Sequence, residues 1–222
     1  MYAYALVKMT DAALVLPKGI VGELHLLGTE DLGAIVEPAL SITDIQQDDE
    51  LLMQAVLHHD QVIRAVFQQT PLLPLRFGTQ FTSAAVLLAH LQAEADTYLS
   101  RLAHLADNAE YTLKLIPQPM PEEPIDLSTA KGRDYFLAKK QRYQAQQDWL
   151  QRQATELTEL QQAIVRCYPT QLDNNPQDGQ HRWHILAPQP APTLLEQVKM
   201  WQAQYPHWAI HLSEALPPYH FV

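Results

Sequence analysis

The ten histidines of this chain are the residues that most readily suggest chemistry. The densest cluster is His58-His59-Asp60, and histidine and carboxylate side chains are the kind that bind zinc. Adjacent residues of a helix point about 100° apart, so the two histidines do not easily share one tetrahedral site. The sequence has no His-Glu-x-x-His motif and no pair of cysteines. We therefore predict no metal site, and we interpret His59 as a hydrogen-bonded structural clamp in the core or at its boundary.

Motifs for nucleophilic catalysis and phosphate binding are also missing from the sequence. The seven glycines are scattered singly, and no Gly-x-Ser-x-Gly elbow occurs. We interpret Cys167, beside Tyr168, as a small buried hydrophobe, and the pair Glu122-Glu123 in its Pro-rich surroundings as solvated. Nothing assembles a nucleophile, a base and an oxyanion donor. We predict a non-enzymatic protein without catalytic residues or cofactor; a ligand-binding or enzymatic protein is the alternative.

The composition limits the possible partners. A formal net charge of −10 argues against general nucleic-acid binding, which needs a basic face. No apolar run approaches the roughly 18 residues that cross a bilayer, and the first residues lack the order of a signal peptide. A single cysteine fits a reducing compartment. We expect a protein of the cytoplasm that neither inserts into a membrane nor binds nucleic acid.

One charged residue, Arg76, interrupts the stretch 70–81 between two helical patterns. The prolines of this stretch favour an extended course, and its glycine permits a turn with positive φ. A buried, unpaired guanidinium is very costly, so Arg76 is either exposed or held by partners. We expect a buried structural clamp that is bonded to backbone carbonyls or to a carboxylate such as Asp60 or Glu37. Anion or substrate binding by Arg76 is the alternative.

Hydrophobic periodicity predicts two α+β domains, residues 1–107 and 108–222. The first domain should hold a strand at 2–8, a hairpin at 22–38, and helices at 48–69 and from residue 83 to about 108. The second has the order strand, helix, strand, strand, helix, strand, which is ferredoxin-like, and ends in an extended tail. The first domain is a related, modified α+β unit.

The longest helical pattern in the second domain runs from about residue 128 to residue 168. Apolar residues recur every seven positions, but most positions three further on are polar, unlike a long coiled coil. We expect one end of this helix to pack on a sheet and its Gln-rich middle to be wet or to meet a partner. The basic residues near its start either form a solvated face or meet an acidic partner: Lys131, Arg133, Lys139, Lys140 and Arg142.

Several short stretches, taken in order along the chain, resemble the gas vesicle protein GvpF/GvpL family. The most specific is Leu73-Pro74-Leu75-Arg76-Phe77-Gly78-Thr79, and His59-Asp60 is similar to the family's pair of a histidine and an acidic residue. The others are residues 2–7, 32–36, 110–115, 132–137 and 217–222. The chain departs from the pattern at Tyr111-Thr112, where the family usually has Trp-Gly, and lacks the usual Gly-Pro-Trp before its closing motif.

The resemblance implies a cytoplasmic, non-enzymatic accessory protein needed to build gas vesicles. It implies contact with the small hydrophobic shell protein and with other accessory proteins, and it leaves open the F-like or the L-like branch. A partner for an aggregation-prone subunit needs an apolar surface of its own. We expect the long helix, through Tyr143, Trp149 and Leu150, or an open sheet edge to provide this surface.

Overall fold

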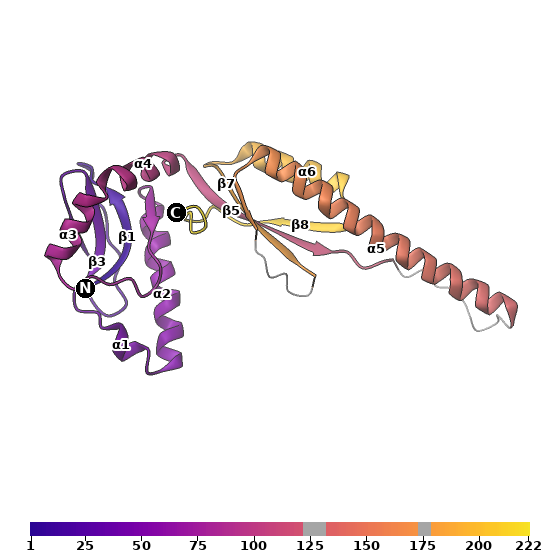
Figure 1. Ribbon diagram of the computed structural model, residues 1–222, viewed down its shortest axis with the longest axis horizontal. Helices are drawn as coiled ribbons and strands as arrows, with labels where there is room; N and C mark the ends of the chain where they lie inside the picture. The colour runs from indigo at the N-terminus through magenta and orange to yellow at the C-terminus, as the bar shows by residue number, and fades with distance from the viewer. Residues whose placement is uncertain (122–131, 173–178) are drawn as a thin grey trace. The chain divides into compact units, whose positions relative to one another are not determined.

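The chain forms two compact units in the computed structural model, which describes residues 1–121, 132–172 and 179–222. The first unit is Met1–Glu110 with Ala215–Val222, and the second is Tyr111–Glu214. Each unit has its own sheet (Figure 1), four-stranded in both cases, so the predicted α+β class is confirmed. Within the described residues, no helix combines the length and the apolarity that a membrane span requires.

The sheet of the first unit has the order β2-β3-β1-β4, and all its neighbouring strands are antiparallel. Its strands are β1 (Tyr2–Lys8), β2 (His25–Gly28), β3 (Leu32–Glu37) and β4 (Leu72–Pro74). Both faces of β1 are apolar, and it lies inside the sheet with its first six residues buried, as predicted. The predicted hairpin joins β2 to β3 through a turn closed by the Thr29 N–H and the Leu32 carbonyl, at 2.8 Å.

The helices of the first unit lie on both faces of this sheet (Figure 1). They are α1 (Ile42–Ile45), α2 (Asp49–Phe67), α3 (Ala84–Ala93) and α4 (Ala95–Leu105). The carboxylate of Asp48 caps α2 by accepting two backbone N–H groups. One sequence expectation needs correction: the second helix, expected from residue 83 to about 108, is broken into α3 and α4 at Glu94.

The second unit has the ferredoxin-like order of elements and the sheet order β6-β7-β5-β8. Its strands are β5 (Asn108–Pro117), β6 (Thr170–Leu172), β7 (His181–Pro188) and β8 (Trp208–Leu212). Its helices are α5 (Arg133–Cys167) and α6 (Pro192–Gln204). Pro169 cannot donate a backbone hydrogen bond, which fits the edge position of β6 directly after it. The basic residue Lys131 and the pair Glu122-Glu123 lie outside the described residues.

The last residues of the chain belong to the first unit, whereas the predicted domain 108–222 assigned them to the second. Leu216 and Glu110 exchange two backbone hydrogen bonds of 2.8 and 2.9 Å. Hydrogen bonds from the Tyr219 N–H to Pro217 and from the Phe221 N–H to Pro218 make a tight turn. The expectation of an extended tail is therefore wrong for these residues, because local turn bonds replace pairing with a strand.

Candidate functional site

Arg76 is exposed, so the expectation of a buried clamp at this position is wrong. It makes no ion pair with any residue in the described ranges. Its backbone carbonyl accepts hydrogen bonds from the Thr79 N–H at 3.1 Å and the Thr79 hydroxyl at 2.7 Å. The chain turns here through Gly78, whose φ is 91°. The turn directs the Arg76 side chain to solvent, where its charge needs no partner.

Glu37, one of the two carboxylates considered for Arg76, is fully buried and held by other groups. It accepts backbone N–H bonds from Ile20, Val21 and Gly22 at 2.9, 2.8 and 2.5 Å. The Tyr4 hydroxyl donates a fourth bond at 2.5 Å. Burial, together with this bond to the carboxylate, raises the pKa of Tyr4 well above its ordinary value. Glu37 therefore fixes the loop before β2 to the end of β3.

Asp60, the second of these carboxylates, bonds to the C-terminal segment. It accepts a bond from the Tyr219 hydroxyl at 2.5 Å and forms an ion pair with Arg64, one helical turn further along α2, at 2.6 Å. Burial and the nearby carboxylate raise the pKa of Tyr219. Glu110 adds a second anchor, because its buried carboxylate accepts the His220 N–H at 2.9 Å and lies 2.7 Å from the His220 Nδ1.

His59 is 6% exposed and hydrogen-bonded at both ring nitrogens. Its Nε2 lies 3.0 Å from the Leu75 carbonyl, which can only accept, so Nε2 carries the proton of the neutral ring. Its Nδ1 then accepts from the Tyr2 hydroxyl at 2.8 Å, and the Tyr2 oxygen accepts from the Gly78 N–H at 3.4 Å. Burial lowers the pKa of His59 and raises the pKa of Tyr2 to about 12. This chain of bonds joins α2 to the stretch after β4.

The C-terminal half of α5 is seated on the sheet of the second unit through a polar cluster. The Gln153 amide donates to the carbonyls of Gln118 and His207 at 2.8 and 3.1 Å. Glu156 accepts the His207 N–H at 3.0 Å and lies 2.5 Å from the His207 Nδ1. Further along the helix, Leu160 and Ile164 are fully buried. The expected packing of one end of this helix on a sheet is therefore seen.

Residues 133–150, called here the free half of α5, carry large apolar side chains that are not covered. Phe136, Tyr143 and Leu150 are 71, 64 and 49% exposed. Of the residues predicted to bind a partner, Trp149 differs, because it is half-buried and its indole N–H donates to the Gln118 carbonyl at 3.2 Å. Phe136 was not among the predicted residues, although the seven-residue spacing from Tyr143 could have pointed to it.

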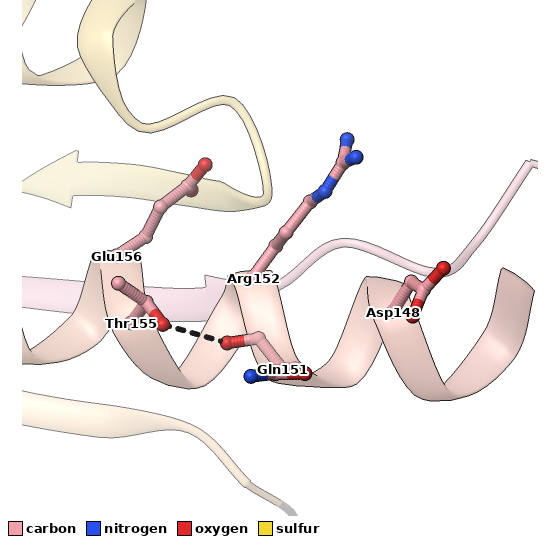
Figure 2. A pocket seen from close by; sticks show the side chains of 5 residues that line it. All are labelled: Asp148, Gln151, Arg152, Thr155 and Glu156. Atoms are coloured by element: carbon pink, nitrogen blue, oxygen red, sulfur yellow. Dashed lines mark hydrogen bonds between the residues drawn. The ribbon is translucent and has the colours of Figure 1, made fainter.

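Two shallow hollows adjoin α5 at the start of its seated part. The first has a volume of about 380 Å³ and is lined by Asp148, Gln151, Arg152, Thr155 and Glu156 (Figure 2). The second, of about 320 Å³, is lined by Met120, Pro121, Ala145, Asp148, Trp149 and Arg152. Neither lining includes a histidine, a cysteine or a serine. Both linings carry acidic and basic side chains, so these hollows offer mixed charge for contact.

Comparisons with known proteins agree over the whole length of the chain. The sequence model of a family described as "Gas vesicle synthesis protein GvpL/GvpF" matches residues 1–222. The crystal structure of gas vesicle protein GvpF from Microcystis aeruginosa is similar at a TM-score of 0.65 and 15% identity, with 99% of this chain and 97% of that chain covered. GvpF from Anabaena sp. PCC7120 is similar at a TM-score of 0.66 and 14% identity, with 99 and 94% covered. No curated protein sequence matches this chain.

Proposed function

The chain belongs to the gas vesicle synthesis protein GvpL/GvpF family and has a role in gas vesicle formation. We propose that it fulfils this role by binding the small apolar shell subunit before assembly. A shell subunit that is not yet assembled exposes apolar surface and aggregates in water. A soluble protein that covers this surface keeps the subunit available for assembly. This role is non-enzymatic and needs no cofactor.

The observation that carries the proposal is the line of exposed apolar side chains on the free half of α5. Phe136, Tyr143 and Leu150 are spaced by seven residues, so they lie along one side of the helix over about 21 Å. A partner helix packed along this line would cover all three side chains. Large apolar groups that are aligned and uncovered indicate a binding surface more strongly than single exposed residues do.

Charge supports the same surface. Five basic and two acidic residues lie between Arg133 and Arg152, in a chain whose formal net charge is −10. Lys139, Lys140 and Arg142 are exposed beside the apolar line. The partner segment should therefore be apolar with acidic or neutral flanks. The negative charge of the rest of the molecule keeps the complex soluble.

Co-expression with the shell protein tests the proposal. In a pull-down, the variant Phe136→Ser/Tyr143→Ser/Leu150→Ser should capture about tenfold less shell subunit than the unmodified protein does. Each replacement removes apolar contact area. The matched control is Leu195→Ser/Met200→Ser, at exposed positions of α6 in the same unit. The proposal fails if the unmodified protein neither co-purifies with shell subunits nor changes how much of them sediments.

We further propose a cytoplasmic protein that delivers subunits to the growing vesicle and contacts other accessory proteins there. If shell binding is not found, the remaining role in vesicle formation is that of a scaffold that contacts those accessory proteins. A nucleotide, metal or small molecule that raises the melting temperature would instead favour the ligand-binding or enzymatic alternative, because tight binding to the folded state stabilises it.

A further inference from the structure

Edge strands present backbone N–H and C=O groups that can pair with another chain. The first unit has the edges β2 and β4, and the second has β6 and β8. β6 continues directly into residues 173–178, which lie outside the described residues.

The edge of β8 is covered by a side chain of its own unit. The outward N–H of Ile210 donates to the Gln202 Oε1 at 2.8 Å, and the Gln202 Nε2 donates to the Trp208 carbonyl at 2.8 Å. The amide of Gln202 thus pairs with this edge as the backbone of a neighbouring strand would. An incoming strand would have to displace it.

The edge of β4 lacks donors. Leu73 pairs with Leu6, and the Leu75 N–H donates to the Tyr4 carbonyl at 2.9 Å, so the backbone groups of Leu72 and Pro74 face outward. Proline has no N–H, which leaves one outward donor in this three-residue strand. Such an edge cannot form a regular ladder with a further strand.

The edge of β2 is neither covered nor interrupted. The hairpin turn makes Thr29 and Leu32 a hydrogen-bonded pair, and in an antiparallel ladder such pairs alternate with pairs that are not bonded. Leu27 therefore bonds to β3, while the N–H and C=O groups of Leu26 and Gly28 face outward. These outward groups have no partner among the described residues. β2 also contains no proline.

We propose that β2 accepts an extended segment of another protein, which adds a strand to the first unit's sheet. This segment is apolar opposite Leu26, whose side chain is 36% exposed, and carries basic residues at its ends. The basic ends follow from the exposed acidic residues near both ends of β2, which are Glu30 and Asp31 after it and Glu23 before it. Lys18 lies across an isolated β-bridge from Glu23, so the end at Glu30 and Asp31 is the more acidic of the two. This site lies on a different unit from α5 and does not depend on the proposed shell binding there.

The same acidic residues argue against a second copy of this chain as the occupant. In an antiparallel pair of two β2 strands, Glu23 of one copy would approach Glu30 and Asp31 of the other. A parallel pair would bring Glu23 close to Glu23. Like charges at facing positions of neighbouring strands are destabilising, so the acidic ends select against self-pairing and favour a basic segment.

The test uses a synthetic peptide of alternating valine and threonine with a lysine at each end, added to the isotope-labelled full chain. Binding should slow hydrogen exchange at the Leu26 and Gly28 amides by about tenfold, because these groups enter hydrogen bonds. A twin peptide with N-methylated amides on its pairing edge has the same side chains and should not slow exchange. The variant Glu30→Lys/Asp31→Lys should bind the lysine peptide more weakly.

Leu26→Pro removes an outward N–H without touching the ladder to β3, and it should abolish the effect on the Gly28 amide. If this variant fails to fold, the N-methylated twin still decides the question. Unchanged exchange at Leu26 and Gly28, or equal protection by both peptides, overturns the proposal. Dimerisation of the chain through β2, measured by sedimentation with and without the peptide, would replace the basic partner by a second copy and so also overturn it.

Discussion

Two regions of the molecule hold side chains in unusual surroundings. The interior of the first unit contains buried polar groups, and the free half of α5 in the second unit carries exposed apolar groups. In the first unit, Glu37 and His59 are polar and buried. On the free half of α5, Phe136 and Tyr143 are large, partly or wholly apolar, and exposed. Neither arrangement follows the usual division of polar and apolar residues between surface and core.

The difference lies in what satisfies each group. Glu37 receives four hydrogen bonds and His59 receives or donates one at each ring nitrogen, all within the first unit. The sheet of the second unit covers the C-terminal half of α5, whereas Phe136 and Tyr143 on the free half stay 71 and 64% exposed. Buried polar groups with a full set of partners stabilise a fold, whereas aligned apolar groups without cover indicate binding. Substitutions in the two regions should therefore affect different properties.

The largest effect expected in the first unit is that of Glu37→Gln. The glutamine has one accepting oxygen in place of two, and its amide nitrogen faces backbone donors, so buried N–H groups lose their partners. We expect the first unit to lose about 3 kcal/mol or more of unfolding free energy. All four tryptophans, Trp149, Trp183, Trp201 and Trp208, lie in the second unit. Urea denaturation followed by circular dichroism and by tryptophan fluorescence therefore separates the two units.

Arg76→Ala is the matched control within the first unit. Its side chain is exposed, so the free energy of unfolding should change by less than about 0.5 kcal/mol. If Arg76→Ala destabilised the first unit as much as Glu37→Gln, the assignment of the clamp to Glu37 would be wrong.

An intermediate effect should come from His59 as the pH falls. Burial lowers the His59 pKa in the folded state below 6.5, so the unfolded state binds the proton more readily. Its contribution to stability is complete above about pH 6.5 and is lost as the pH falls from there towards the folded-state pKa. One such group gives a slope of at most about 1.4 kcal/mol per pH unit. Urea midpoints of the first unit between pH 7.5 and about pH 5 measure this slope.

His59→Gln should remove this slope, since its amide can still donate to the Leu75 carbonyl and accept from Tyr2 but does not titrate. His104→Gln, at an exposed position of α4, controls for the loss of an imidazole. An equal slope in the His59→Gln variant would show that another group is responsible.

The smallest effect on stability should come from Phe136→Ser/Tyr143→Ser on the free half of α5. Both side chains are already exposed, so the tryptophan-detected unfolding free energy should change by less than about 0.5 kcal/mol. Leu160→Ala, at a fully buried position of the same helix, should cost about 2–5 kcal/mol. Similar losses in both variants would mean that the chain itself covers the free half, and the comparison between the two regions would fail.

Elements that depend on a local pattern were predictable from the sequence. Alternation and apolar content predicted β1 and the β2–β3 hairpin, and periodicity predicted α2, α5 and the ferredoxin-like order of the second unit. The seven-residue spacing also marked the apolar line on α5. These features are predictable because the repeat of a strand or a helix acts over a few neighbouring residues. The stretches that resemble the GvpF/GvpL family indicated the family that the whole-chain match then showed.

The pairing of the polar groups, by contrast, could not be predicted from the sequence. The Tyr4–Glu37 bond joins residues 33 apart in the sequence, and the Tyr219–Asp60 bond joins residues 159 apart. A lone arginine in an apolar stretch suggested a buried charge at Arg76, but the turn at Gly78 leaves the Arg76 side chain exposed to solvent. The buried carboxylate of Glu37 therefore has no guanidinium partner there and accepts backbone N–H groups. The cover of Gln202 over β8 is likewise invisible in the sequence. The hydrogen-bond partner of a polar side chain depends on which distant parts of the chain the fold brings together. Local sequence periodicity contains no information about such contacts.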